Sequence, residues 1–330
     1  MSEGTDNVSR MANAIIAEGL KKSYGPVRAV ESLDLAVPEG TVFGLLGPNG
    51  AGKTTTLRML TTLLRPDEGR IEVGGIDVLS RPQEVRRIIG VSGQTAAVDE
   101  YLTGYENLEM VGRLYHLGKK KARERALDLL ERFDLADAAD RPAKTYSGGM
   151  RRRLDLAGAL VVSPPIIFLD EPTTGLDPRS RLGMWDVISE RVRSGTTLLL
   201  TTQYLEEADR LCDDIVVIDH GRAIAQGTPA YLKSQIGGER LHLTVYDKNQ
   251  VSAAADVVKS VGLTEPDVDV EARRISVPVE RGTTALVEAV RRLDAAGIEP
   301  DELEIRKPTL DDVFLKLTGQ KVEDEEVAAS

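Results

Sequence analysis

A glycine-rich run at residues 47–54 has the residue types and spacing of a loop that binds phosphate. It fits the pattern G-x-x-x-x-G-K-[ST] without a mismatch, as Gly47, Pro48, Asn49, Gly50, Ala51, Gly52, Lys53 and Thr54. Glycine lets the backbone wrap closely around an anion, and N–H groups at a helix N-terminus then point at it. The run predicts a nucleotide site in which Lys53 reaches the outer phosphates and the Thr54 hydroxyl ligates Mg²⁺.

The residues on either side give this loop the context that the motif needs. Residues 42–46 are an apolar run that predicts a buried strand. The segment 55–60, which begins with Thr55, can continue as a helix. The simpler interpretation is a glycine-rich turn before a helix, without a ligand.

A second candidate lies where another apolar run ends in two carboxylates. Residues 166–169 predict a buried strand, and Asp170 and Glu171 follow it directly. Asp170 at such a strand end can hold Mg²⁺ beside a phosphate loop. Glu171 can polarise an attacking water as a general base. Taken alone, the same pattern is typical of a strand that ends in charged turn residues, so this interpretation depends on the phosphate loop.

Ser147, Gly148 and Gly149 precede a segment, 150–162, that predicts a helix. A serine there caps the helix and leaves its first N–H groups facing outward, which is also how helices bind anions. By local physics alone, an ordinary helix N-cap is the better interpretation.

Composition narrows the class of protein. The chain has 330 residues, enough for two domains, and a net charge of −11, which argues against nucleic acid as the main partner. Its single cysteine, Cys212, excludes a disulfide within the chain. No apolar stretch approaches the length that spans a bilayer. We expect a cytosolic protein that a partner could dock to a membrane.

The pattern along the chain predicts an α/β fold with a second, smaller module. Short apolar runs separated by turns occupy 14–78, a helical pattern runs from about 81 to 162, and the buried strand runs that follow resemble a parallel α/β sheet. Residues 214–225 predict a hairpin around Asp219-His220-Gly221. The predicted divisions are a leader at 1–13, a nucleotide-binding domain at 14–235, an α+β module at 236–319 and an acidic tail at 320–330.

The order of these motifs resembles the nucleotide-binding subunit of ABC transporters, over residues 14–235. That family has a phosphate-loop cassette with a parallel core sheet, an antiparallel β subdomain and a helical subdomain, here about 95–162. The resemblance implies ATP and Mg²⁺ as ligands. It implies further roles: adenine stacking for Tyr24, contact with Mg²⁺ and γ-phosphate for Gln94, the signature for Ser147 to Gly149, the Walker B pair for Asp170 and Glu171, and the D-loop for Asp177. It also implies a dimer, because the signature of one chain closes over ATP held by the other.

The sequence departs from the family at Tyr146 and Met150, where leucine and glutamine are usual, and at Gln203, where histidine is usual. Glutamine forms hydrogen bonds but does not titrate near neutral pH. We therefore expect Glu171 to be the general base and Gln203 to position γ-phosphate and water.

Within the family, Gln203, the run 146–155 and the C-terminal run 307–315 resemble the ATP-binding subunits of daunorubicin/doxorubicin-resistance-type exporters of actinobacteria. This implies a peripheral ATPase on the cytoplasmic face of the cell membrane that drives efflux of a drug or complex lipid through a separately encoded membrane subunit. Residues 98–106 are the expected docking surface. In that group the C-terminal module is thought to support dimer contacts or communication with the membrane subunit. The alternatives are an ABC ATPase that transports nothing, an importer ATPase, and a nucleotide-sensing module without turnover.

Overall fold

The computed structural model describes residues 12–235 and 238–318, which fall into two compact units. Contacts separate the units after Pro229, so most of α8 (Pro229–Ser234) belongs with the second unit rather than with the predicted nucleotide-binding domain. Asn13, predicted as the end of the leader, already lies in strand β1 (Asn13–Tyr24). The remainder of the leader up to residue 11 and the acidic tail lie outside the described residues.

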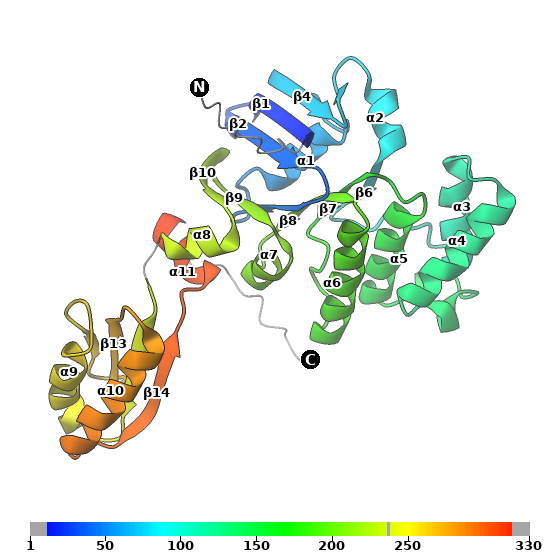
Figure 1. Ribbon diagram of the computed structural model, residues 1–330. Helices are drawn as coiled ribbons and strands as arrows, with labels where there is room; N and C mark the ends of the chain where they lie inside the picture. Colours follow the sequence, from blue (N-terminus) through cyan, green and yellow to red (C-terminus); the bar gives the residue numbers. More distant parts are fainter. Residues whose placement is uncertain (1–11, 236–237, 319–330) are drawn as a thin grey trace, which may run out of the picture. The chain divides into compact units, whose positions relative to one another are not determined.

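A parallel sheet forms the core of the first unit (Figure 1). Strand β3 (Val42–Leu46) pairs with β8 (Thr197–Thr202), β8 with β7 (Ile166–Asp170), and β7 with β6 (Ile89–Ser92), all in parallel. On its other side β3 pairs in parallel with β9 (Asp214–Asp219). These strands read as nearly continuous apolar runs because both faces of a parallel sheet are covered. Their carboxyl ends lie at one edge of the sheet.

An antiparallel part extends the same sheet. Its strands are β1, β2 (Val27–Pro38), β4 (Glu68–Val73) and β5 (Ile76–Asp77), in the order β5-β4-β1-β2. Strand β10 (Arg222–Gly227) pairs antiparallel with β9, so the predicted hairpin is confirmed. A single pair, Arg222 with Ser32, connects β10 to β2. The predicted combination of a parallel core sheet and an antiparallel β subdomain is thus confirmed.

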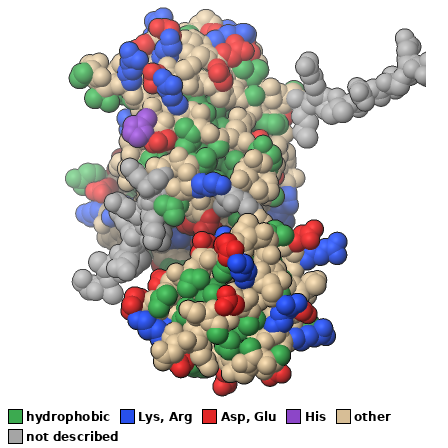
Figure 2. Space-filling model, turned by 90° about the vertical axis from the view of Figure 1, so that its left-hand side faces the viewer, with side chains coloured by type: hydrophobic (Ala, Val, Ile, Leu, Met, Phe, Trp, Pro, Cys, Tyr) green, Lys and Arg blue, Asp and Glu red, His purple; other side chains and the backbone are tan. Residues whose placement is uncertain are grey.

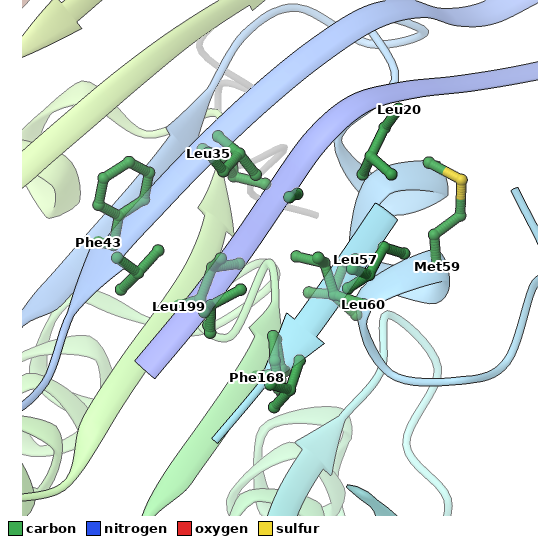
Figure 3. Packing of buried hydrophobic residues seen from close by; sticks show 14 of the residues in the cluster. Leu20, Leu35, Phe43, Leu57, Met59, Leu60, Phe168 and Leu199 are labelled. Carbon is green, nitrogen blue, oxygen red and sulfur yellow. The ribbon is translucent and has the colours of Figure 1, made fainter. Parts of the chain in front are cut away.

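Helix α1 (Lys53–Leu60) follows the phosphate loop and is fixed by its apolar side chains. Its Leu57 and Leu60 are buried in one cluster with Phe168 of β7 and Leu199 of β8 (Figure 3). Burial of a leucine side chain contributes about 1.5–3 kcal/mol relative to exposure. Packing therefore fixes the helix, and with it the loop that enters the helix, against the sheet.

The other helices of this unit are α2 (Pro82–Ile88), α3 (Gly104–Leu114), α4 (Lys119–Arg132), α5 (Gly148–Leu160), α6 (Pro178–Arg193) and α7 (Leu205–Leu211). Three of them, α3, α4 and α5, fall inside the helical subdomain predicted at 95–162. The helical pattern predicted from residue 81 is wrong at β6. A short apolar run does not distinguish a buried strand from a helix by periodicity, and here pairing with β7 decides for strand.

The second unit combines a four-stranded antiparallel sheet with helices, which confirms the predicted α+β module. Its elements are β11 (Arg240–Val245), α9 (Val251–Lys259), β12 (Asp267–Asp269), β13 (Arg274–Pro278), α10 (Gly282–Ala295), β14 (Pro300–Arg306) and α11 (Leu310–Thr318). The order β12-β13-β11-β14 is that of the ferredoxin-like arrangement. Alternate residues of β11, such as Leu241 and Leu243, share a buried cluster with Ala289 and Leu293 of α10.

Charged side chains of both signs are interspersed on the face of the molecule shown in Figure 2. On the described part of this face, blue and red side chains lie side by side and none of the blue groups forms a broad basic patch (Figure 2). Among the described residues, no helix has the length and apolar composition needed to cross a bilayer.

Gly90 of β6 packs so closely against the end of α5 that a larger side chain there should destabilise the fold. A Cβ added to Gly90 would collide with the Ala159 carbonyl oxygen and lie 2.8 Å from Pro164 Cγ. We expect Gly90→Ala to lower the free energy of unfolding by about 1–3 kcal/mol, the usual cost of overpacking. For a unit of this size each kcal/mol corresponds to a fall of about 2–4 °C in the thermal unfolding midpoint.

Gly158→Ala is the matched control, because Gly158 lies within α5 and a Cβ there meets open space. Alanine is favoured over glycine inside a helix by about 0.8–1.0 kcal/mol, so this variant should not lose stability. Equal midpoints for the two variants would contradict the packing described here.

Candidate functional site

The carboxyl ends of four adjacent parallel strands bring the predicted site residues to one edge of the sheet. The phosphate loop follows β3, Gln203 follows β8, Asp170 ends β7 and Gln94 follows β6. In open α/β sheets this edge is where ligands bind. The order of the strands in the sheet therefore brings together residues that are far apart in the chain.

The phosphate loop is braced by backbone that approaches two of its glycines closely. A Cβ on Gly47 would collide with the Ile218 carbonyl oxygen, and one on Gly52 would collide with that of Ala29. Gly52 also has φ 106°, a conformation that favours glycine. The turn after β9 closes on the loop, since Gly221 N donates to the Ala51 carbonyl oxygen at 3.0 Å. These contacts explain the glycines at both positions.

Lys53 lies folded back into the loop and is only 4 % exposed. Its Nζ donates to the carbonyl oxygens of Gly47 at 2.6 Å and Pro48 at 3.1 Å, and lies 3.9 Å from Glu171 Oε1. Burial lowers the pKa of Lys53, while the charges of Glu171 and Asp170 oppose that shift. The loop thus holds a desolvated ammonium group beside two carboxylates. Because charges interact more strongly away from water, this ammonium group would bind a phosphate anion more strongly than a solvated one would.

Asp170 is buried and receives two hydroxyl hydrogen bonds on one oxygen. Thr54 Oγ1 donates to Asp170 Oδ1 at 3.1 Å, and Thr201 Oγ1 of β8 donates to the same atom at 2.5 Å. The Thr54 and Asp170 oxygens therefore converge on one place. Hard oxygen donors of this kind fit Mg²⁺, which usually takes one or two protein oxygens together with phosphates and water.

Glu171 adopts a backbone conformation that aims it away from the strand direction. Its φ is 51°, uncommon for a residue other than glycine. Its N–H donates to Thr201 O at 3.0 Å and to Thr201 Oγ1 at 3.1 Å. Thr201 thus holds the Asp170 carboxylate and the Glu171 backbone. Sequence reasoning missed this residue, although a threonine at the end of an apolar strand was a signal available in the sequence.

A cavity of about 370 Å³ lies over the loop and gathers most of the predicted nucleotide ligands. Its lining consists of Tyr24, Ala29, the loop and helix start from Pro48 to Thr55, Gln94 and Glu171. Tyr24 is 48 % exposed at the end of β1, so its ring is accessible. Asp170 lies behind the cavity, buried against Thr54.

Seven predicted residues that the structure describes do not line this cavity: Gly47, Ser147, Gly148, Gly149, Asp170, Asp177 and Gln203. Gln203 follows β8, and the next residue, Tyr204, stacks on Arg181 with its ring centroid 4.7 Å from Cζ. Asp177 caps α6, where bonds from Ser180 lower the pKa of the Asp177 carboxyl. Ser147 caps α5 by accepting from Met150 N at 3.2 Å, as the N-cap interpretation predicted.

Tyr146, one of the departures from the usual signature, is part of the packing of the helical subdomain. It is buried, and its hydroxyl donates to the Ala138 carbonyl oxygen at 2.6 Å. Gly104 at the start of α3 makes room for it, since a Cβ there would collide with the Tyr146 hydroxyl. The larger side chain is therefore accommodated below the signature, and Ser147 remains exposed.

Comparisons with known proteins agree with this geometry. The family described as "ABC transporter" matches residues 30–174, and the family described as "ATP-binding protein DrrA1-3-like, C-terminal domain" matches residues 227–318. Among solved structures, an ATP-binding subunit of an ABC transporter is 29 % identical with a TM-score of 0.63, covering 67 % of this chain and 92 % of that one. A dimeric ATP-binding cassette in a post-hydrolysis state with ADP and phosphate is 26 % identical with a TM-score of 0.62, covering 65 % and 98 %.

Curated relatives extend the similarity over nearly the whole chain. The daunorubicin resistance ATP-binding protein DrrA2 of Streptomyces coeruleorubidus is 54 % identical over 95 % of this chain and 97 % of its own length. The daunorubicin/doxorubicin resistance ATP-binding protein DrrA of Streptomyces peucetius is 52 % identical over 94 % of each. The chain therefore belongs to the ABC transporter family, as an ATPase of the group that carries the DrrA1-3-like C-terminal domain.

Proposed function

We propose that this chain is the motor subunit of an ABC exporter, and that it couples ATP binding and hydrolysis to efflux of a hydrophobic drug or complex lipid through a separate membrane subunit. The observation that carries the proposal is the cavity in which Lys53, Thr54, Gln94 and Glu171 meet. The names of the relatives, which concern resistance to daunorubicin and doxorubicin, support the choice of cargo class. Such a motor works as a peripheral protein on the cytoplasmic face of the membrane.

In this proposal the nucleotide lies along the cavity. Tyr24 stacks on adenine, and the N–H groups of the loop and Lys53 bind the phosphates. Thr54, Asp170 and Gln94 would hold Mg²⁺, and the charge of the ion would offset negative charge on the transferred phosphoryl group. Lys53 must then exchange its bonds to the Gly47 and Pro48 carbonyl oxygens for bonds to phosphate oxygens. Because the ammonium group is already buried, this exchange costs less desolvation energy than it would for a solvated lysine.

Glu171 is the proposed general base. Its carboxylate lines the cavity beside Lys53, at the place where water would attack the terminal phosphate. A base accepts the proton as the water oxygen bonds to phosphorus, so it must be within hydrogen-bond reach of that water. Gln203 lies at the end of β8, next to the strand that carries Glu171, and in the proposal it positions γ-phosphate without exchanging protons.

A second copy of the chain is the proposed partner in an ATP sandwich. Ser147, Gly148 and Gly149 are at the start of α5 and outside the cavity of their own chain, so their outward N–H groups are free to meet nucleotide on another copy. The dimeric cassettes among the similar solved structures support this arrangement. Closure on ATP and reopening after hydrolysis would supply the mechanical step.

The membrane subunit is proposed to dock beside residues 98–106. A groove of about 200 Å³ adjoins this loop and is lined by apolar side chains that include Val98, Leu108 and Val111. Tyr101 at the loop tip is 84 % exposed. Asn107 fixes the loop, because its amide bonds Asp99 N at 2.9 Å and the Asp99 carbonyl oxygen at 3.0 Å. A rigid loop beside an apolar groove suits a short helix from a partner.

Glu171→Gln tests the proposed base. The amide is nearly isosteric but does not accept a proton, so we expect kcat for ATP hydrolysis to fall by a factor of about 10²–10⁴, the usual range for general base catalysis. ATP affinity should stay close to that of the wild type. Turnover by phosphate release and affinity by titration with a fluorescent ATP analogue give the two values. Near-normal turnover would remove Glu171 from this role.

Thr201→Val tests how the carboxylates are oriented. Valine has the shape of threonine but lacks the hydroxyl that binds Asp170 and Glu171 N. We expect kcat to fall by about tenfold or more, since loss of positioning acts on the chemical step. Thr201→Ser keeps the hydroxyl and should restore most of the rate. If valine and serine behave alike, the hydroxyl has no such role.

Charge reversal at Glu100 tests the docking surface. The Asp99 side chain accepts from Tyr101 N at 2.9 Å and holds the turn, so reversal there would disturb folding as well. Glu100→Lys should lower transport and capture of the co-expressed membrane subunit while ATP binding by the purified chain stays unchanged. Glu39→Lys reverses an exposed charge in the turn before β3 and is the control. Equal transport by the two variants would count against docking at this loop.

A further inference from the structure

Arg152 of α5 is a buried charged residue to which sequence reasoning gave no role. It lies in the helix that begins after Ser147 and is 7 % exposed. Its guanidinium donates to the carbonyl oxygens of Asp170 at 2.6 Å, Glu171 at 2.7 Å and Pro172 at 3.0 Å. One side chain therefore holds the backbone that carries both catalytic carboxylates.

The same guanidinium also reaches the loop after β6. Its Nη1 donates to the Gly93 carbonyl oxygen and, at 3.4 Å, to that of Gln94. Arginine has five donors in a rigid planar fork, whereas lysine has one nitrogen and cannot span these acceptors together. The loop after β6 and the turn after β7 are thus joined through one residue of α5, beyond the pairing of their two strands.

Asp155, one turn further along α5, holds the other part of that loop. Its Oδ2 accepts from Ser92 Oγ at 2.5 Å, and its Oδ1 accepts from Ala97 N at 2.8 Å. Gln94 lies between these two attachment points. Asp155 is itself buried, and its Oδ2 lies 3.9 Å from Arg152 Nη1. It also lines the groove beside residues 98–106.

We propose that Arg152 and Asp155 are positioning residues that hold Glu171 and Gln94 in one rigid frame with α5. Neither touches the cavity, so they act through the groups they hold and not on the nucleotide. Since Ser147 begins the same helix, displacement of α5 moves the signature, Gln94 and the Glu171 turn together. This inference rests on the proposed roles of Glu171 and Gln94.

The left-handed backbone conformation of Glu171 depends on the contacts that support it. A residue in this conformation persists when its surroundings over-determine it. Here Thr201 holds the Glu171 N–H and Arg152 holds the Glu171 carbonyl oxygen, so both sides of the residue are fixed. Removing one support should let the turn relax and move the carboxylate, without changing the loop that binds phosphate.

Arg152→Lys in the purified full chain is the test. A displacement of about 1 Å at a catalytic group can reduce rate by about 10²-fold, so we expect kcat for ATP to fall at least tenfold. Affinity for a fluorescent ATP analogue should stay within about threefold, because the loss acts on the chemical step. Amide hydrogen exchange should become faster in residues 93–97 and 170–173.

Arg125→Lys is the matched control. Arg125 also serves several acceptors, the carbonyl oxygens of Leu160 at 3.1 Å and Val161 at 3.2 Å and the Ser163 hydroxyl at 3.0 Å, but at the far end of α5. We expect its kcat and the exchange of both segments to match the wild type. If Arg152→Lys also matches the wild type in kcat, or weakens ATP binding as much as it slows turnover, the positioning role is overturned.

Asp155→Asn is the second variant and decides the question if Arg152→Lys does not fold. It removes one of two acceptors, so exchange in 93–97 should rise while that in 170–173 changes less. Unchanged exchange in both segments would contradict the frame. Glu171→Gln is run alongside: if it keeps its turnover, the proposed base is wrong, whereas the exchange results still report on the link itself.

Discussion

Parallel pairing of β7 beside β8 is the constraint on which the site depends. In this register Asp170 pairs with Thr201, and on the other side of β8 Leu46 pairs with Thr202. The last residue before the phosphate loop and the Asp170 carboxylate thereby lie opposite neighbouring residues of β8. A slip of one residue would turn every side chain of β7 to the opposite face. Asp170 would then no longer meet the Thr54 and Thr201 hydroxyls.

The strand register also buries four charged side chains beside the phosphate loop. Lys53, Arg152, Asp170 and Glu171 are all less than 10 % exposed. Burial of charge is costly unless geometry and hydrogen bonds compensate. Desolvation nevertheless lowers the pKa of Lys53, although the charges of Glu171 and Asp170 oppose that shift. A buried ammonium group interacts more strongly with a phosphate anion than a solvated one does, so Lys53 favours a phosphate ligand in the cavity.

Much of this arrangement could be read from the sequence because the motifs sit at strand ends. The strand before the run 47–54, the strand that ends at Asp170, the cap at Ser147 and the hairpin around 219–221 are where the sequence predicts them. What was missed depends on tertiary register. The pattern at β6 is apolar and short, so only its pairing with β7 identifies it as a strand. The bonds of Thr201 exist because β8 lies beside β7, and those of Arg152 and Asp155 exist because α5 meets the β7 turn and the Gln94 loop. The division after Pro229 also follows from contacts rather than from the glycines at 237–238.

In the proposed function this chain provides half of a composite ATP site. The molar mass of the Glu171→Gln chain, measured by light scattering with Mg²⁺ and either ATP or ADP, tests it most directly. We expect twice the single-chain mass with ATP and the mass of one chain with ADP, and we expect the ATP-dependent dimer to be lost when Ser147→Arg is added. A chain that binds ATP tightly yet keeps the mass of one copy would contradict the composite site.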